Sequence, residues 1–429
     1  MGKRPLFLFS GLASVAVAST VLLLGVGASG CDDKGDGVPL TEGLASAINY
    51  DALYVLNGAG DSITIIDTAK EYVTPTKIRL RNTSFPHYLA LSKDRTQLLL
   101  TAGTFVTGGQ TPDAGADSGT RVDAGFDAGF DAGGEIPDAG GEDSGEQEAG
   151  SFATATPQVR SGLHLLADND QKDQGSKGAV LLLNATTGVT IKGRRTDAPV
   201  FNAIFSPDEG DIWTTSMTSP GNAVLLTPTT LVDRLKVEVE NQPARITISK
   251  NGRYAFVVNS GSNSVTVIDV ASKVVRATLK VGSGGGVWQG ENDLAYIDDA
   301  EKKTLTSVQT TNLGIRRTFQ LGFQVGTVVP GPDGYLWITD PEGGRVVLYE
   351  TDTDVKVWDI ATGRGAYGIA FSDDGKWGYV SNTADNTVAI IDVKGRRVHR
   401  RLLDISSPNW IVFRKKDSAQ PFPSDAGRD

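Results

Sequence analysis

Short apolar runs alternate with polar turns along most of the chain, and residues 242–281 show the pattern most clearly. This stretch contains four runs rich in Val, Ile, Thr and Phe, and the turns between them are rich in Gly, Asn, Ser and Lys. Runs of this composition, bounded by turn residues, are typical of β-strands joined as hairpins. The stretch therefore predicts a four-stranded antiparallel meander, which cannot cover both of its own faces alone.

Similar meanders recur along the chain. The expected second strand appears as YVLN at 54–57, FVVN at 256–259 and YVSN at 379–382, with weaker forms at 98–102, 212–216, 295–299 and 336–340. The expected first strand appears at 86–91, 200–205, 243–248, 285–289, 325–329, 366–371 and 408–413. Apart from one long interruption, first strands recur about every 40 residues, a period that indicates propeller blades. Seven such units predict an all-β, seven-bladed propeller over residues 51–416.

The order of strands at the two ends of the chain predicts how the ring closes. The chain enters with a second strand near 53–57 and ends with a first strand at 408–413. We therefore expect the first blade to combine three N-terminal strands with one C-terminal strand. Such pairing would leave no open sheet edge at the junction.

The repeated second-strand motif resembles that of the YVTN-type β-propeller repeat family, a relative of lactonase-like and amine-dehydrogenase heavy-chain propellers. The resemblance covers residues 50–415 without the interruption. It implies the propeller fold, and it implies two activities as alternatives, namely lactone hydrolysis or a non-catalytic place in a periplasmic redox enzyme. A WD40 propeller is the structural rival, but the chain has one Trp-Asp dipeptide, at 358–359, without a Gly-His partner.

The N-terminus carries the pattern of a bacterial export signal. Two basic residues precede an apolar run at 6–26, and small residues then precede Cys31. Small residues before a cysteine resemble a lipobox, which implies that Cys31 is lipidated and becomes the mature N-terminus. Cys31 is the single cysteine, so an internal disulfide is excluded. We expect a signal peptide at 1–30 and a polar tether at 31–50, with an uncleaved signal anchor as the alternative.

These features predict a lipoprotein whose first partner is the lipid bilayer. Several acyl chains on one cysteine hold a protein firmly on a membrane. We expect the outer membrane or the cell surface. The periplasmic face of the inner membrane is the alternative, because Asp32 resembles a retention signal of enteric bacteria.

Residues 104–178 form the long interruption, inside the second blade. The segment contains five Asp-Ala-Gly triplets and few large apolar side chains, so we expect it to be disordered. It holds 14 acidic and 4 basic residues, a net charge of −10 that equals the net charge of the whole chain. The low overall pI of 5.0 therefore describes the insert rather than the propeller. A second disordered segment is expected at 417–429.

Motifs for catalysis or cofactor binding are scarce. The three histidines, His87, His164 and His399, show no metal-ligand spacing, and neither a Cys-x-x-Cys-His nor a Gly-x-Ser-x-Gly motif occurs. The Arg-Arg pairs at 194–195, 316–317, 396–397 and 400–401 accompany outer strands, which favours a solvated rim over a nucleic-acid surface. We expect no metal, no cofactor and no nucleic-acid partner.

The best candidate site follows from propeller geometry, because first strands line the central channel. At matched positions near their starts the chain carries His87, Tyr88, Phe201, Asn202, Arg245, Thr327, Tyr367, Asn409 and Trp410. Such a rim can bind a small polar ligand or an envelope protein, while the alternative is that these side chains fill the channel. Lactone opening would need a base and a cation, for which His87 and Arg245 are the candidates, without an evident acidic partner. We expect a monomeric binding or interaction module.

Overall fold

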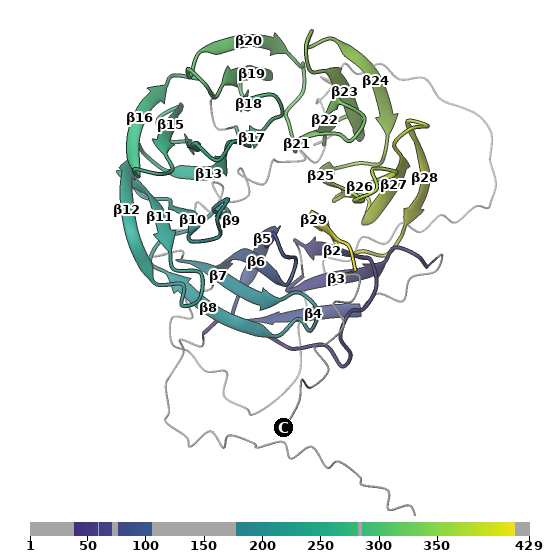
Figure 1. Ribbon diagram of the computed structural model, residues 1–429. Helices are drawn as coiled ribbons and strands as arrows, with labels where there is room; N and C mark the ends of the chain where they lie inside the picture. Colours follow the sequence, from purple (N-terminus) through teal and green to yellow (C-terminus); the bar gives the residue numbers. More distant parts are fainter. Residues whose placement is uncertain (1–37, 59, 71–75, 105–176, 282–284, 417–429) are drawn as a thin grey trace, which may run out of the picture. The chain divides into compact units, whose positions relative to one another are not determined.

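Seven antiparallel sheets stand as blades around a central axis, so the predicted seven-bladed β-propeller is confirmed (Figure 1). The computed structural model describes residues 38–58, 60–70, 76–104, 177–281 and 285–416. These residues contain strands and turns but no helix, and therefore no helix that could cross a membrane. The predicted signal peptide, Cys31, most of the insert and the C-terminal segment lie outside the described residues.

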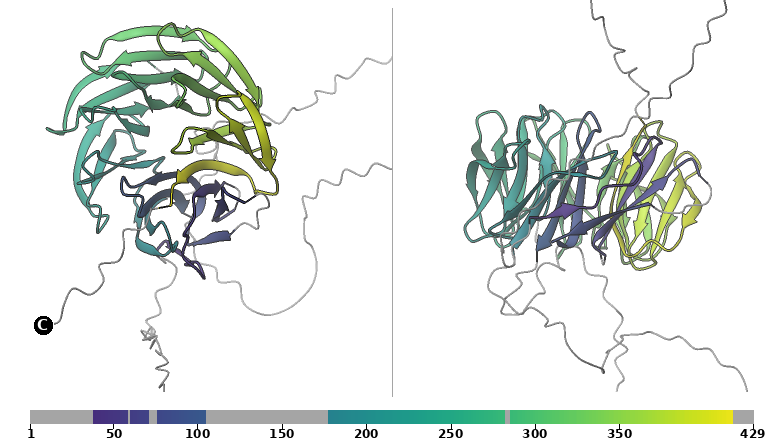
Figure 2. Two further views of the ribbon diagram at one scale, coloured as in Figure 1. Left: turned by 45° about the vertical axis from the view of Figure 1, so that its right-hand side comes forward. Right: turned by 90° about the horizontal axis from the view of Figure 1, so that it is seen from below.

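Each blade runs from an inner first strand to an outer fourth strand (Figures 1 and 2). In the order of blades 1 to 7, the first strands are β29 (Pro408–Arg414), β5 (Ser84–Leu91), β9 (Ala203–Phe205), β13 (Pro243–Ile248), β17 (Val287–Gln289), β21 (Val328–Pro330) and β25 (Ala366–Phe371). The second strands are β2 (Ala52–Asn57), β6 (Gln97–Thr104), β10 (Ile212–Ser216), β14 (Tyr254–Asn259), β18 (Leu294–Asp299), β22 (Tyr335–Asp340) and β26 (Trp377–Asn382).

The two outer rows follow the same order. The third strands are β3 (Ser62–Asp67), β7 (Lys177–Asn184), β11 (Gly221–Leu226), β15 (Ser264–Asp269), β19 (Thr304–Gln309), β23 (Arg345–Glu350) and β27 (Thr387–Asp392). The fourth strands are β4 (Thr76–Arg81), β8 (Thr190–Thr196), β12 (Asp233–Val239), β16 (Val274–Leu279), β20 (Ile315–Gln320), β24 (Lys356–Ala361) and β28 (Arg397–Leu402).

The ring closes in blade 1 as the strand order predicted. The C-terminal strand β29 pairs antiparallel with β2, and Leu53 lies opposite Phe413 in this register. The three strands β2 to β4 near the N-terminus thus share a sheet with the C-terminal strand β29. The inner edge of β2 is therefore paired, and the two ends of the propeller hold each other in place.

A short strand that the sequence pattern did not indicate, β1 (Leu40–Thr41), pairs with β4 at the outside of blade 1. It lies in the segment that we assigned to the tether. Thr41 also reaches blade 2, where its hydroxyl donates to Gly188 O at 2.6 Å and its amide donates to Thr190 Oγ1 at 2.7 Å. Further along, Ile48 is buried and its amide donates to Thr186 O at 2.9 Å. Residues 38–48 therefore join blades 1 and 2.

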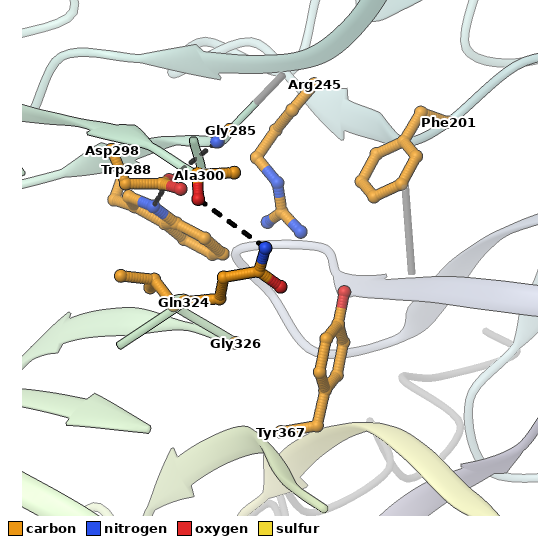
Figure 3. Close-up of a pocket in the computed structure, with 11 residues that line it drawn as sticks. Phe201, Arg245, Gly285, Trp288, Asp298, Ala300, Gln324, Gly326 and Tyr367 are labelled. Atoms are coloured by element: carbon orange, nitrogen blue, oxygen red, sulfur yellow. Dashed lines mark hydrogen bonds between the residues drawn. The ribbon is translucent and has the colours of Figure 1, made fainter. Parts of the chain in front are cut away.

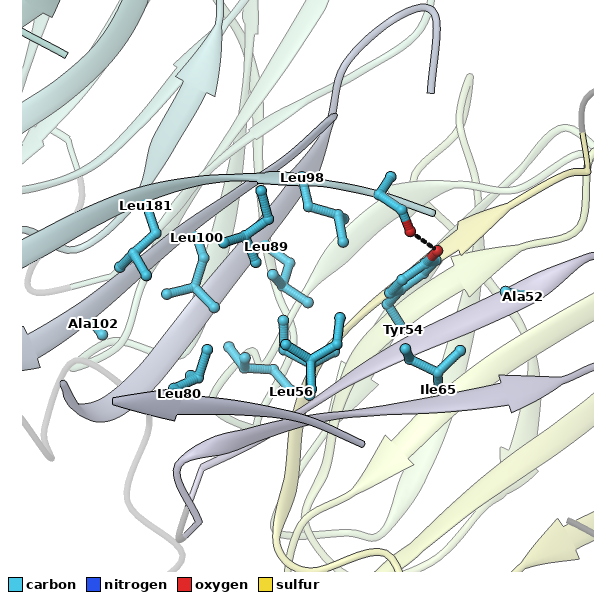
Figure 4. Close-up of a cluster of buried hydrophobic side chains, with 14 of the residues drawn as sticks. Ala52, Tyr54, Leu56, Ile65, Leu80, Leu89, Leu98, Leu100, Ala102 and Leu181 are labelled. Carbon is cyan, nitrogen blue, oxygen red and sulfur yellow. Dashed lines mark hydrogen bonds between the residues drawn. The ribbon is translucent and has the colours of Figure 1, made fainter. Parts of the chain in front are cut away.

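The hydrophobic core lies between adjacent blades rather than within one sheet. Between blades 1 and 2, Tyr54 and Leu56 of β2 pack with Leu98 and Leu100 of β6 and Leu181 of β7 (Figure 4). Second strands have a neighbour on both faces, so they form continuous buried runs, and all six residues of β2 and of β14 are buried. This burial explains why these strands show little polar alternation in the sequence.

The asparagine that ends the repeated motif links the second strand to the third. Asn57 donates from Nδ2 to Ser62 Oγ at 2.8 Å and to Thr64 Oγ1 at 2.9 Å. Asn259 makes both corresponding bonds in blade 4, and Asn382 makes the first of them, to Thr387 Oγ1, in blade 7. All three asparagines are fully buried, so these bonds satisfy the N–H groups of their side-chain amides.

Arginines of the fourth strands reach the neighbouring blades. Arg194 donates to Leu231 O at 2.7 Å, and Arg401 donates to Thr362 O at 2.7 Å. The arginines of the predicted basic rim therefore also stabilise the structure, because these side chains satisfy carbonyl groups of the neighbouring blades.

Candidate functional site in the central channel

The channel side chains project inward because the first strands lose their regular pairing at one common position. In blades 4 and 7, the pairing of β13 with β14 and of β25 with β26 skips two residues, 244–245 and 367–368. In blade 1, residues 409–410 of β29 are skipped in the same way. Irregularities of this kind turn side chains out of the ladder. They place Arg245, Tyr367 and Trp410 at the channel.

Arg245 lies at the centre of this cluster and is 5% exposed. Its Cζ atom lies 3.9 Å from the ring centre of Trp288 and 5.0 Å from the ring centres of Phe201 and Trp410. Aromatic faces attract a cation electrostatically, and they do so more strongly where water is excluded. Burial lowers the pKa of Arg245, while Tyr367, Tyr88 and Asp298 raise it. The guanidinium remains charged because its ordinary pKa is very high.

No carboxylate of the described residues lies within ion-pair distance of Arg245. The hydroxyl of Tyr367 forms a hydrogen bond with the guanidinium. The planar guanidinium has five N–H donors. Arg245 thus keeps donors that face the pocket (Figure 3).

Asp298, near the end of β18, supplies an acidic group to the same pocket and is 4% exposed. Its Oδ1 atom accepts hydrogen bonds from Gly286 N at 2.6 Å and from Trp288 Nε1 at 3.0 Å. Burial raises the pKa of Asp298 to about 6, although the bonds from Trp288 and Gly286 and the charge of Arg245 oppose this rise. Its carboxyl group can therefore gain or lose a proton close to neutral pH.

The pocket has a volume of about 340 Å³, including the part that is open to solvent. Its polar lining comes from Arg245, Asp298, Gln324 and Tyr367, and Phe201 and Trp288 form its aromatic wall (Figure 3). The Gln324 amide donates to Ala300 O at 3.5 Å. Blades 3 to 7 all contribute residues, so the pocket exists only when the ring is assembled.

A glycine is required beside the acidic group. A Cβ atom at Gly285 would lie 2.1 Å from Asp298 O and 2.4 Å from Asp298 Oδ2. These separations are far below van der Waals contact, so a larger side chain would displace the carboxyl group. Gly285, before the first strand of blade 5, thus leaves space for Asp298.

Comparison of the blades shows why Asp298 is unusual. At the position that matches Asp298, four other blades carry a buried hydroxyl group. It donates to a carbonyl at the start of the first strand of the next blade, at 2.5–2.8 Å. The pairs are Thr101 to Phe201, Thr215 to Ala244, Thr339 to Tyr367, and Ser381 to Asn409. In blade 5 the carboxyl group instead contacts its own first strand and the pocket. This departure from the repeat is the sequence signal that could have identified Asp298.

The structure separates the sequence-predicted rim residues into two groups. Arg245 and Tyr367 line the pocket, and Trp410 lies against both of them, with its ring 6.4 Å from that of Tyr367. The ring of Tyr88 contacts that of Trp410 in a tilted arrangement, 4.6 Å between ring centres, and burial raises the pKa of Tyr88. These aromatic side chains therefore pack against one another beside the pocket.

Two of the other predicted residues, Asn202 and His87, are engaged by backbone groups. Asn202 forms a reciprocal pair with Ile246, donating to its carbonyl at 2.8 Å and accepting from its amide at 2.9 Å. The two ring nitrogens of His87 lie 2.7 Å from Phe85 O and 2.9 Å from Val200 O, and burial lowers its pKa. His87 does not line the pocket, so Asp298 is the acid–base group that faces Arg245 there.

Asn409 is half-buried at the start of β29, and its carbonyl accepts the bond from Ser381. Sequence reasoning missed Trp288 and Gln324 as well as Asp298. Among the residues that the structure describes, no group of three or more His, Cys, Asp or Glu side chains could hold a metal ion.

No family model matches the sequence, and a search of curated proteins finds no match. Among solved structures, the periplasmic gluconolactonase PpgL of Pseudomonas aeruginosa is similar over 85% of this chain and 99% of that chain, with a TM-score of 0.57 and 15% identity. A functionally unknown protein of Desulfotomaculum acetoxidans has the same coverage and TM-score with 10% identity. The dihydro-heme d1 dehydrogenase NirN, over 85% and 75% of the two chains, has a TM-score of 0.52 and 11% identity. At these identities the likeness shows a shared propeller fold.

Proposed function

We propose that the chain is a lipid-anchored cell-envelope propeller that binds a small carboxylate-bearing ligand at Arg245. The observation that carries this proposal is a charged guanidinium that is 5% exposed, lies among aromatic rings and has no ion pair with a described carboxylate. A buried charge without an ion pair is unfavourable, and an anionic ligand would relieve this cost.

The shape and charge of the pocket favour a monocarboxylate. A guanidinium fork matches a carboxylate or a phosphate with two parallel hydrogen bonds. A phosphate dianion would bring two negative charges beside Asp298, with Arg245 as the single cation of the lining. A carboxylate brings one charge. The Gln324 amide and the Tyr367 hydroxyl can bind hydroxyl or carbonyl groups elsewhere on the ligand.

Replacement of the arginine tests the proposal. Arg245→Gln should weaken the binding of small monocarboxylates about 100-fold, because a bidentate charged contact contributes roughly 3 kcal/mol. Titration calorimetry with a panel from acetate to gluconate and benzoate measures this loss. Arg253→Gln is the matched control, since Arg253 is an exposed arginine on the same blade, 4.9 Å from the ring centre of Tyr254. Equal losses in both variants, or none in Arg245→Gln, would contradict the proposal.

Lactone hydrolysis is the second candidate, favoured by the presence of Asp298 and Arg245 in one pocket and by the fold shared with a gluconolactonase. Asp298 would accept a proton from a water molecule while the oxygen of that water attacks the lactone carbonyl. Arg245 would stabilise the oxyanion that forms. The ring C–O bond then breaks, and the released alkoxide takes up the proton to give a hydroxy acid. Turnover of a lactone panel that disappears in Asp298→Asn would support catalysis, and ligand binding without turnover would exclude it.

Membrane attachment is supported by the apolar run at 6–26 and the small residues before Cys31. Cys31→Ala should release the protein from the membrane fraction and abolish the lipid-dependent shift in mass. Ser29→Ala serves as the control, because it retains a small residue before the cysteine. Membrane fractionation and intact-mass measurement decide the outcome, and unchanged attachment of Cys31→Ala would refute the lipid anchor.

A further inference from the structure

The pocket brings together two buried groups of opposite charge that do not form an ion pair. Arg245 is 5% exposed and Asp298 is 4% exposed, and each shifts the pKa of the other through its charge. The aromatic ring of Trp288 contacts both groups, since it stacks on the guanidinium and donates from Nε1 to the carboxylate. A ligand that enters the pocket therefore meets a cation and a titratable acid.

The two oxygens of Asp298 have different environments. Oδ1 accepts both the Gly286 amide and the Trp288 indole N–H, at 2.6 and 3.0 Å. Both hydrogen bonds that other described residues donate to this carboxyl group go to Oδ1, and none of them goes to Oδ2. A proton on Oδ1 would have to displace one of the two donors, so protonation occurs on Oδ2. The carboxyl group can thus change its charge while its position stays fixed by Gly286 and Trp288.

We propose, on the basis of the proposed function, that the pocket binds a carboxylate and a proton together, the carboxylate at Arg245 and the proton at Asp298 Oδ2. An incoming carboxylate would share the single cation with Asp298. Two carboxylates that compete for one cation in a buried site do not both remain charged, so one of them takes up a proton. The resulting O–H group can donate a hydrogen bond to the ligand, as in paired carboxyl groups of other proteins.

The other ionisable groups around the pocket do not account for this proton. Burial raises the pKa of Tyr88, which keeps its phenol neutral, and burial lowers the pKa of His87, whose ring nitrogens lie against backbone carbonyls. Arg245 stays charged, and Tyr367 contributes a hydroxyl that is hydrogen-bonded to it. Asp298 is therefore the group among the described residues here that can change its charge near neutral pH.

The expected result is a pH-dependent affinity for benzoate, used as the probe between pH 5 and 8. Binding should be tightest below about pH 6 and should weaken up to about tenfold per pH unit above it, as required for uptake of one proton. Calorimetry at pH 7 in buffers of different ionisation enthalpy should show close to one proton taken up per benzoate. Asp298→Asn should bind benzoate with an affinity that no longer depends on pH and with no proton uptake.

Asp299→Asn is the matched control, because the neighbouring Asp299 forms its ion pair with Lys302, at 2.8 Å, outside the pocket. This variant should keep the pH dependence. Wild-type binding that is independent of pH, without proton uptake, would overturn this inference and leave the carboxylate site intact. Unimpaired benzoate binding by Arg245→Gln would instead overturn the proposed function. If Asp298→Asn failed to fold, the buffer dependence of the wild-type protein alone would decide.

Discussion

Truncation before Pro408 should prevent the ring from folding. The deletion removes β29, which leaves the inner edge of β2 unpaired and exposes the interface between blades 7 and 1. In that interface Ile411 is 2% exposed and packs in one cluster with Leu53, Val55 and Tyr379. Each large apolar side chain of this kind contributes about 1.5–3 kcal/mol, so loss of the strand removes an amount comparable to the whole stability of a domain.

Soluble yield and the far-ultraviolet circular dichroism melting curve measure this effect. A shorter truncation after Lys416 is the control. It keeps β29 whole and should leave the melting temperature unchanged. A protein that lacked β29 and still melted cooperatively near the wild-type temperature would show that the pairing of β2 with β29 is dispensable.

Asp298→Asn should stabilise the protein at pH 8. The folded-state pKa of Asp298, about 6, exceeds its ordinary value of 3.8, so the folded protein binds this proton more tightly than the unfolded chain does. The contribution of Asp298 to the wild-type stability should therefore decrease as the pH rises from about 4 to about 6 and stay level above. A shift of about two pKa units corresponds to roughly 3 kcal/mol, which is the upper limit of the gain because Arg245 loses a favourable charge interaction in the variant.

Chemical denaturation at pH 4 and pH 8 measures the difference between the two proteins. Asparagine retains the oxygen that accepts from Gly286 and Trp288, so the comparison isolates the charge. The higher free energy of unfolding of Asp298→Asn should be present at pH 8 and absent at pH 4. The neighbouring variant Asp299→Asn should have the opposite effect at pH 8, since hydrogen bonds and the charge of Lys302 outweigh burial and lower the pKa of Asp299. A variant Asp298→Asn that is less stable than wild type at pH 8 would contradict the reasoning.

The strands were predictable because burial on both faces and the terminal asparagine impose the same residues on blade after blade. The ring closure followed from the strand order alone. The pocket was only half predictable, since Arg245 and Tyr367 lie on first strands and could be matched by position. Asp298 could not be assigned in this way, because it comes from blade 5, whose second strand departs most in charge from the repeat.

Two further features depend on contacts between distant residues, which periodicity does not encode. Gln324 precedes the short strand β21 and reaches the pocket through the packing of blade 6 beside blade 5. Strand β1 has two residues, too few for a pattern, and it exists because Thr41 finds partners in blade 2. Composition alone suggested a tether there.

The link made by residues 38–48 determines how the propeller responds to mechanical load. A pulling force applied at Val38 acts first on the β1–β4 pairing, then on the bonds from Thr41 to blade 2, and then on Ile48. The force reaches β2 only after those contacts have broken, so the pairing of β2 with β29 does not bear the load until then. A force on the N-terminal end would thus break the contacts of residues 38–48 before it separates β2 from β29 and opens the ring.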